Sequence, residues 1–585
     1  MTTDTEFPPA VAPEISDQTV PTENESDTFG EWVPRQKFDY ATYLAKPEAA
    51  RGQPSGNWLA SGERYEWKEE YGDVAPRDER LERELFGHPD DEPIGKGLDF
   101  SKVLQLTADI IGPHQPKAIE TFEEAGLHPV MIENIKFMGY TTPTPIQKMC
   151  IPTILKGYDM ISVAQTGSGK TAAFLIPILS KLMGKAKKLA APRPPPGSQI
   201  VLGSHYCAEP LVLVVAPTRE LSTQIFDESR RFCYRSMLRP CVVYGGADTY
   251  TQRIELAKGC DVLIATPGRL LDFMERGRIL SLRRVKFIVI DEADEMLDMG
   301  FEPQLRRIIE DSDVNQDDDR VCMMFSATFP KSVRKLAKEF LADENLIIKI
   351  GRIGSTHSNI KQHVIYTDEA NKQTALFDLL CSSPPSRTII FAGNKRTVDR
   401  LDDFLYNARL PTTSIHGDRT QREREDALIS FRSGKCPILI ATAVAARGLD
   451  VKNVMHIINY DMPNNIDEYI HRIGRTARIG NHGLATTFYN EGNSEIAEDL
   501  VKILIESNQD VPDFLEQYRP EGELKFEESE SEGEDNDNPV QGDGGNADDW
   551  VAPAQENGSG GDSWGVEAPP AAAGGDNWND GGAGW

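Results

Sequence analysis

Short runs of apolar residues recur along the middle of the chain and alternate with longer segments of mixed polarity. The runs are continuous rather than alternating, which is typical of parallel strands that are buried on both faces. They predict an α/β fold in which helices cover both faces of a parallel sheet. In the first half of the chain these runs are Met160–Ala164, 211–216, 262–265, 287–290 and 323–325.

The same pattern begins again after residues 351–359, which we interpret as a linker. Two α/β domains in tandem are therefore predicted, at 118–350 and 360–519, with a connecting segment at 101–117. The predicted strands of this second set are 388–391, 412–415, 438–441 and 455–459.

Charge is distributed unevenly between these domains and the two ends of the chain. Residues 1–100 hold 23 acidic and 10 basic side chains, and residues 520–585 hold 17 acidic and one basic, whereas 101–519 carry 52 of each. All seven tryptophans lie outside the neutral middle. The ends are predicted to be disordered acidic arms, with one short helix at 78–86. Because the middle is neutral, phosphate contacts would need a local group of basic residues.

Composition argues against two classes of protein. The eight cysteines show no metal-ligand spacing, which favours small core residues in a reducing compartment over a disulfide scaffold. No apolar run approaches 18 residues, and the first residues lack a basic and then apolar leader. We therefore expect no membrane segment and no secretory signal.

A glycine-rich loop follows the first apolar run. Its glycines would let backbone N–H groups turn inward around a phosphate, and Lys170 would bring a cation to the same oxygens. Thr171 would offer its hydroxyl to Mg²⁺ at the start of a helix. The loop departs from the consensus because Ala164 stands where glycine is usual, so the prediction depends on the preceding strand and the helix expected after it. The predicted phosphate ligands are Thr166, Gly167, Ser168, Gly169, Lys170 and Thr171.

An acidic motif, Asp291-Glu292-Ala293-Asp294, follows the apolar run at 287–290. It would emerge at the carboxyl end of a buried strand, where open α/β sheets bind ligands. Asp291 is predicted to hold Mg²⁺, partly through water, and Glu292 to orient and deprotonate the attacking water. Ser326 and Thr328 follow another strand and are predicted to connect the acidic motif to the next segment.

The second domain carries a basic segment at 471–478. Arg475 and Arg478 are three residues apart and would share a face if this segment is helical. Paired guanidinium groups suit a γ-phosphate and its developing charge. The predicted catalytic site is therefore divided between two domains, and its catalytic residues are Lys170, Asp291, Glu292, Arg475 and Arg478.

With these motifs, residues 118–515 resemble the DEAD-box RNA helicases of superfamily 2. The resemblance implies two tandem RecA-like domains, ATP and Mg²⁺ as cofactors, and ATP hydrolysis coupled to RNA unwinding. Residues 139–147 are similar to the family's Q motif, in which Gln147 would read the adenine edge and Tyr140 would stack on the ring. Phe122 occupies the upstream aromatic position. The family usually has glycine at Ala477, where we expect a small effect because alanine adds one methyl and favours helix.

Further segments resemble the RNA-contacting motifs of that family. They offer backbone N–H, hydroxyl and guanidinium groups, which fit phosphate and ribose rather than base edges. Binding should therefore be largely independent of RNA sequence. Asp450, at the end of the last motif, would face the nucleotide. The implied RNA-binding residues are Pro217, Thr218, Arg219, Gly246, Thr266, Pro267, Gly268, Arg269, Gly417, Asp418, Thr442 and Arg447.

The flanking segments are similar to the Ded-type branch, and the acidic, tryptophan-containing tail is similar to the Vasa branch. The resemblance implies a monomeric helicase core that acts on mRNA in translation initiation or in handling messenger ribonucleoproteins (mRNPs), in the cytoplasm, in ribonucleoprotein granules or shuttling to the nucleus. Protein partners would bind the N-terminal arm and the tail. Three alternatives remain: a DNA translocase of the same superfamily, an ATP-gated RNA clamp with little unwinding, and a germ-granule or storage role.

Overall fold

The computed structural model describes residues 74–87, 107–194, 206–276, 279–310, 313–315, 319–351, 359–446, 451, 453–477 and 482–520. The predictions made for the remainder of the two acidic arms, for most of the linker, and for Arg447, Asp450 and Arg478 lie outside these residues.

The first domain contains an eight-stranded sheet in the order β1-β8-β2-β7-β6-β3-β5-β4. Seven strands are parallel, and β1 joins the edge antiparallel to β8, with Ala108 opposite Ile350. Most of these strands are four to six apolar residues long, as predicted for a sheet buried on both faces. Its strands are β1 (Ala108–Ile111), β2 (Met160–Ala164), β3 (Val212–Val215), β4 (Pro240–Val243), β5 (Val262–Ala265), β6 (Phe287–Ile290), β7 (Val321–Ser326) and β8 (Leu346–Ile350).

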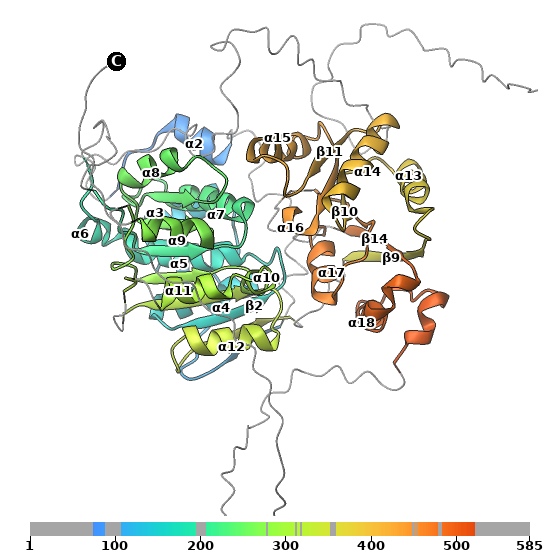
Figure 1. Cartoon of the computed structure of the whole chain (residues 1–585). Helices are drawn as coiled ribbons and strands as arrows, with labels where there is room; N and C mark the ends of the chain where they lie inside the picture. Colours follow the sequence, from blue (N-terminus) through green and yellow to red (C-terminus); the bar gives the residue numbers. More distant parts are fainter. Residues whose placement is uncertain are drawn as a thin grey trace, which may run out of the picture. The chain divides into compact units, whose positions relative to one another are not determined.

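Helices cover both faces of this sheet (Figure 1). Val212 and Val214 of β3 belong to one apolar cluster, formed with α3, α4, α5 and α7. Leu213 and Val215 belong to another, formed with α9 to α12. The helical elements are α2 (Glu79–Phe86), η3 (Glu123–Ala125), α3 (Pro129–Phe137), α4 (Pro145–Lys156), α5 (Lys170–Met183), α6 (Ala186–Leu189), α7 (Arg219–Phe232), α8 (Thr249–Ala257), α9 (Pro267–Glu275), α10 (Ala293–Asp298), α11 (Glu302–Ile309) and α12 (Lys331–Phe340).

Two ordered pieces of this domain lie ahead of residue 118, where the sequence placed its start. Strand β1 falls within the expected connecting segment, and helix α2 confirms the short helix predicted at 78–86 in the first acidic arm. Asp78 caps α2, and Leu81 and Leu85 pack with Tyr234 of the first domain. The domain therefore begins earlier than predicted, because an edge strand and a docked helix each bury apolar side chains against it.

The second domain contains a six-stranded, wholly parallel sheet in the order β11-β12-β10-β13-β14-β9. Ile390 and Ala392 of β10 face α13 and α14, whereas Ile389 and Phe391 face α15 and α16. Its strands are β9 (Ile360–Tyr366), β10 (Thr388–Ala392), β11 (Thr412–Ile415), β12 (Ile438–Thr442), β13 (His456–Asn459) and β14 (Gly483–Tyr489). Its helical elements are α13 (Lys372–Ser382), α14 (Lys395–Asn407), α15 (Gln421–Arg432), α16 (Ala443–Ala446), α17 (Ile466–Ile473), η4 (Glu491–Asn493), α18 (Ser494–Glu506) and η5 (Asp513–Tyr518).

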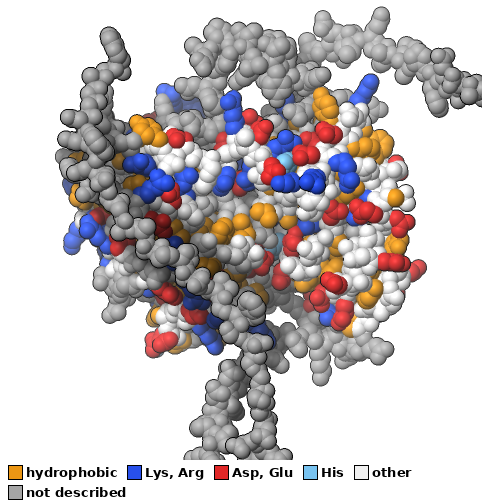
Figure 2. Space-filling view, in the orientation of Figure 1, with side chains coloured by type: hydrophobic (Ala, Val, Ile, Leu, Met, Phe, Trp, Pro, Cys, Tyr) orange, Lys and Arg blue, Asp and Glu red, His pale blue; other side chains and the backbone are white. Residues whose placement is uncertain are grey.

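The two parallel-sheet α/β domains confirm the predicted fold class. In the described regions no helix is long and apolar enough to cross a membrane. Lysine and arginine side chains are interspersed with acidic ones on the face shown in Figure 2. This mixture agrees with the neutral balance of the middle of the chain.

Candidate functional site

The glycine-rich loop joins β2 to α5. Gly167 and Gly169 have φ of 77° and 93°, in the left-handed region that glycine tolerates best. Lys170 is the first residue of α5 and is buried. Its Nζ donates to the carbonyl oxygens of Ala164 at 2.8 Å and of Ser326 at 3.4 Å. The loop thus places an ammonium group and a helix N-terminus together at the carboxyl edge of the sheet, where a phosphate can bind.

Gln147 ties the predicted adenine-reading segment to this loop. It is part of a capping box at the start of α4, where its Oε1 accepts from the backbone N–H of Thr144 at 3.0 Å. Its Nε2 donates to the carbonyl oxygen of Gly169 at 3.2 Å. Each end of the amide therefore makes one protein contact, and one N–H and one lone pair remain for a base edge.

The two aromatic residues predicted for the adenine site have different surroundings. Phe122 is only 2% exposed and packs in the core of the first domain. Tyr140 is half-buried, and its ring centroid lies 6.4 Å from that of Phe232. Tyr140 is therefore partly accessible to a ligand, whereas Phe122 packs inside the domain.

The acidic motif follows β6 as predicted. Asp291 is buried, and its Oδ1 accepts from the backbone N–H of Glu292 at 3.0 Å. Burial, followed by the charge of Glu292, raises the pKa of Asp291 to about 7 although Lys170 opposes the shift. Glu292 has φ 52° and ψ 55°, a left-handed conformation that costs energy for a residue with a side chain. This backbone conformation turns the chain from β6 into α10 and leaves the carboxylate at the strand end.

Glu292 is the carboxylate best placed to act as the base. It is buried, and its Oε2 has no hydrogen-bond partner in the described regions. Burial raises its pKa, and the positive charge of Arg475 from the second domain opposes that shift. A desolvated carboxylate with a free oxygen is suited to accept a proton from water.

Asp294 is the residue of the acidic motif that contacts the segment of Ser326 and Thr328, as the sequence predicted for those two residues. Its Oδ2 accepts from the backbone N–H of Ala327 at 3.0 Å and from the N–H and Oγ1 of Thr328 at 2.8 and 2.9 Å. The Oγ of Ser326 donates to the carbonyl oxygen of Thr328 at 2.7 Å. The acidic motif is therefore attached to the segment that follows β7.

His471, near the end of α17, brings the second domain to the same carboxylates. Its Nδ1 lies 2.5 Å from Oε1 of Glu295, and its Nε2 lies 3.5 Å from Oδ2 of Asp294. Burial alone would lower the pKa of His471, but the two carboxylates outweigh it and raise the pKa to about 10. The same interaction holds the pKa of Asp294 well below its usual range despite burial. Thr166 adds a second connection, because its Oγ1 donates to the carbonyl oxygen of Gly474 at 3.2 Å.

The basic segment is not a continuous helix, so the predicted shared helical face is wrong. Helix α17 ends at Ile473, and Gly474 is its C-cap. Arg475 is buried beyond that end, where its Nε donates to the carbonyl oxygen of His471 at 3.2 Å. Ala477 has φ 52° and is 2% exposed, so helix preference, one of the two reasons given for expecting a small effect of alanine, does not apply at this position. A left-handed backbone explains why glycine would be favoured there.

The residues present fit a magnesium ion. Asp291 and Glu292 are two buried carboxylates with few compensating charges, and Thr171 begins the adjacent helix. No group of three or more His, Cys, Asp or Glu side chains in the described ranges is arranged to hold a metal by itself. Such an arrangement suits Mg²⁺, which usually keeps waters and binds one or two protein groups together with phosphate oxygens.

The predicted RNA-binding residues of the first domain gather around Arg219, the first residue of α7. Thr218 caps α7, because its Oγ1 accepts from the N–H of Leu221 at 3.3 Å. The guanidinium of Arg219 lies against Gly246, where any Cβ would lie 2.3 Å from Nη1. The φ of 78° favours glycine at this position, and the absence of a Cβ lets the guanidinium lie close to the backbone.

The remaining predicted contacts of the first domain lie at the start of α9. Thr266 is its N-cap and Pro267 its first residue, and open space surrounds Gly268. Arg269 reaches the carbonyl oxygen of Ala247 at 3.4 Å. Arg269 thus links α9 to the loop that contains Gly246.

Two side-chain contacts join this region to α15 of the second domain. Nη1 of Arg219 donates to Oε1 of Gln421 at 2.8 Å. Nη2 of Arg424 lies 2.6 Å from Oε1 of Glu220, and both side chains are largely buried. Sequence reasoning missed Glu220, Arg424, Asp294, Glu295 and His471 as partners between domains. Two signals were available: Arg424 lies in the segment after Gly417, and His471 begins the basic segment.

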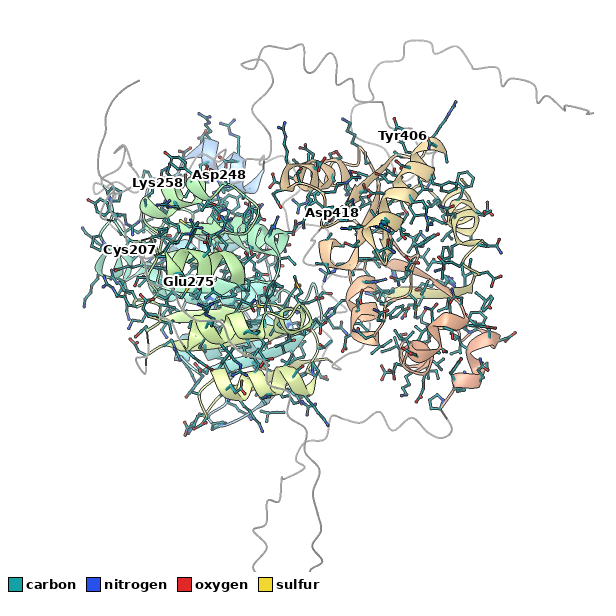
Figure 3. All side chains as sticks on the ribbon, viewed as in Figure 1. Cys207, Asp248, Lys258, Glu275, Tyr406 and Asp418 are labelled. Carbon is teal, nitrogen blue, oxygen red and sulfur yellow. The ribbon has the colours of Figure 1, made fainter. Side chains whose placement is uncertain are left out.

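In the second domain, Gly417 and Asp418 lie in the loop between β11 and α15, where Figure 3 labels Asp418. A Cβ on Gly417 would meet nothing within 4 Å, and Asp418 is exposed. Thr442 is the half-buried last residue of β12. These positions are accessible to a ligand at the carboxyl edge of the second sheet.

Comparison with known proteins agrees with this geometry. A family model described as DEAD/DEAH box helicase matches residues 144–336, and one described as helicase conserved C-terminal domain matches 371–480. A DEAD box protein from the hyperthermophile Methanococcus jannaschii is 33% identical, over 67% of this chain and 98% of its own, with a TM-score of 0.38. The chain belongs to the DEAD-box helicase family.

Two further structures are similar to this DEAD-box helicase. The yeast DEAD-box splicing factor Prp28 is 32% identical over 74% of this chain and 91% of its own, with a TM-score of 0.38. Dbp5 of S. cerevisiae, bound to RNA and ADP BeF3, is 29% identical over 67% of this chain and 93% of its own, with a TM-score of 0.55. The two matched helicase domains make the chain a DEAD-box RNA helicase of superfamily 2.

Proposed function

We propose that this DEAD-box helicase hydrolyses ATP to separate short RNA duplexes or to remodel RNA–protein complexes, in mRNA translation initiation or mRNP handling. One observation carries the proposal. The arginine-bearing segment of the second domain contacts the phosphate loop and the acidic motif of the first, where Gly474 meets Thr166 and His471 lies between Asp294 and Glu295. Hydrolysis therefore depends on both domains, and events at the nucleotide can be transmitted to both halves of an RNA site.

In the proposed reaction, Lys170 and the backbone of the phosphate loop bind the β- and γ-phosphates, and Gln147 selects adenine. Asp291 and Thr171 would hold Mg²⁺, which neutralises phosphate charge when bound. Glu292 accepts the proton of the attacking water. Arg475 stabilises charge on the γ-phosphate, and we propose the same role for Arg478 from its position in the sequence motif.

The same domain contacts couple this chemistry to RNA. Asp294 connects the acidic motif to Thr328, and His471 connects it to α17. Arg219 and Glu220, beside the predicted RNA residues of the first domain, bind Gln421 and Arg424 of the second. When the two domains close, they would bind one RNA strand in a bent conformation that is incompatible with a duplex. Phosphate release would then reopen the cleft between the domains.

The cellular assignment rests on the ends of the chain. Acidic arms with spaced tryptophans suit docking to protein partners, because single aromatic side chains can anchor an interface. We propose mRNA as the substrate, translation-initiation or mRNP proteins as partners, and the cytoplasm, ribonucleoprotein granules or nuclear shuttling as the setting. Crosslinking and sequencing of bound RNA from cells would test this assignment.

A strand-displacement assay tests the activity itself. A short RNA duplex with a single-stranded extension should separate with ATP but not with a non-hydrolysable analogue, and RNA should stimulate ATPase more than DNA of the same sequence. Equal stimulation by DNA would favour a translocase. RNA-stimulated ATPase without duplex separation would favour a clamp.

A further inference from the structure

Helix α14 presents a row of charged side chains to the segment that carries Gly417 and Asp418. Lys395, Asp399 and Asp402 are four and then three residues apart, so they lie on one face of the helix. Each of the three contacts a different point of the segment from Thr412 to Arg419. Helix α14 therefore makes side-chain contacts with both the edge strand β11 and the loop that follows it.

Asp402 holds the strand. Its Oδ1 accepts from Oγ1 of Thr412 at 2.6 Å, and its Oδ2 accepts from Oγ of Ser414 at 2.7 Å. Both hydroxyl residues are buried although β11 is an edge strand. Buried polar groups are costly unless they are paired, and apolar residues on this face of β11 would have been sufficient for stability alone. The polar residues here are paired with Asp402 instead.

Asp399 holds the loop. Its Oδ1 lies 3.0 Å from Nε2 of the buried His416 and accepts from Nη2 of Arg419 at 3.0 Å. The same Nη2 of Arg419 donates to Oγ of Ser414 at 2.9 Å. His416 and Arg419 immediately flank Gly417 and Asp418, so one carboxylate fixes the loop at both ends.

The third contact orients the loop residue itself. Nζ of Lys395 lies 2.6 Å from Oδ2 of Asp418, and both side chains are more than half exposed. An exposed pair of this kind adds little stability, and it leaves Asp418 accessible at the surface. Figure 3 shows the label of Asp418 in this loop of the second domain.

We infer that Asp399 is a positioning residue for RNA binding, which holds the loop at 416–419 in the shape that presents Gly417 and Asp418 to the RNA backbone. The inference rests on the proposed function, because it takes that loop as a contact for RNA. Asp399 itself does not touch the RNA and acts through His416 and Arg419.

The direction in which RNA affinity changes on removal of Asp399 distinguishes a positioning role from simple charge repulsion. Removing an acidic side chain near a polyanion should strengthen binding when the charge merely repels phosphate. Removing a positioning carboxylate should weaken binding, because Arg419 and His416 lose the group that fixes them. Asp403 provides a matched control, since it lies on the same helix, is exposed and has no hydrogen bond or ion pair within the described segments.

The test is the affinity of the full chain for a fluorescent oligo-uridine RNA, measured in the presence of ADP and beryllium fluoride. We expect Asp399→Ala to raise the Kd by about 5- to 10-fold, in line with losing hydrogen bonds to a charged group. The Kd of Asp399→Asn should lie between those of wild type and Asp399→Ala, because the amide keeps one acceptor oxygen. Asp403→Ala should leave the Kd unchanged or slightly lower. The KM for ATP without RNA should stay within about 2-fold of wild type in each variant.

An unchanged or lowered RNA Kd in folded Asp399→Ala protein would overturn the inference. So would a KM for ATP that rises by the same factor as the RNA Kd, because this would indicate general damage to the second domain. A wild-type protein that binds RNA but separates no duplex would overturn only the proposed helicase function, since this test reads binding alone.

Discussion

Nδ1 of His471 lies 2.5 Å from Oε1 of Glu295, a contact between the two domains that the sequence did not reveal. Both side chains are almost fully buried, and Asp294 lies on the other side of the ring. A protonated imidazole between two carboxylates is a charge-assisted connection in a desolvated place. The acidic motif therefore carries the predicted catalytic carboxylates and also connects the two domains.

This contact predicts how stability depends on pH. The pKa of His471 is raised to about 10, so its contribution should be complete below the unfolded value of about 6.5 and lost as the pH rises towards 10. The pKa of Asp294 is depressed, so its contribution is lost only as the pH falls below about 4. We expect His471→Ala to lower the urea midpoint most near pH 6 and progressively less at pH 8 and pH 10. An equal deficit at all three values would contradict a protonated His471.

Glu292→Gln tests the assignment of the base. The amide keeps the shape of the side chain but does not accept a proton from water, so ATP turnover should fall by about 100-fold or more. ATP and RNA should still bind, and the closed complex with RNA should last longer. Stopped-flow release of phosphate and filter binding of RNA measure the two effects, and near wild-type turnover would remove Glu292 from the base role.

Gly169→Ala tests the contact between the phosphate loop and Gln147. A Cβ at Gly169 would lie 2.6 Å from Nε2 of Gln147 and 3.2 Å from Oγ1 of Thr144, on a backbone with φ of 93°. We expect ATP affinity to fall at least about 10-fold, because both the phosphate loop and the adenine reader must move. The matched control is Gly184→Ala, where φ is −69° and nothing lies within 4 Å of the added methyl. Equal nucleotide affinities for the two variants, measured by calorimetry, would rule out this contact.

Ala477→Gly tests the strain beside the arginine segment. Ala477 is buried with φ 52°, a conformation that costs an L-residue about 1 kcal/mol and costs glycine little. The variant should therefore raise the melting temperature by a few degrees, of the order expected for about 1 kcal/mol. Thermal unfolding followed by circular dichroism measures the shift. A lower melting temperature would mean that the methyl group packs better than its backbone conformation suggests.

The strands that the sequence predicted share one property. β2, β5 and β6 lie at their predicted bounds, and β3, β7, β10, β12 and β13 lie within two residues of theirs, because burial on both faces requires a continuous apolar run that a pattern can detect. The exception is β11, an edge strand of Thr, Thr, Ser and Ile that also lies where it was predicted. The strands missed lie mainly at edges or carry polar residues. In β9 only alternate residues are buried near its start, and the β8 strand also alternates. A half-exposed strand has no continuous run, so the pattern does not distinguish it from a loop.

The site divides in a similar way. The positions of Lys170, Asp291 and Glu292 were predictable because they follow from local surroundings, namely a glycine turn and a strand end. The positions of Ser326 and Thr328 next to Asp294 also followed from strands that end at the same edge of the sheet.

The sequence alone therefore determined the two parallel-sheet domains and the local chemistry of the nucleotide site, because both depend on residues close together in the chain. Only the tertiary structure decided that His471 meets Glu295, that Glu220 meets Arg424, and that Ala477 lies in a left-handed turn rather than a helix. The physical reason is that a charged side chain can pair with many partners of opposite sign. Which partner it meets, and whether burial makes that contact strong, is set by the packing of segments far apart in sequence.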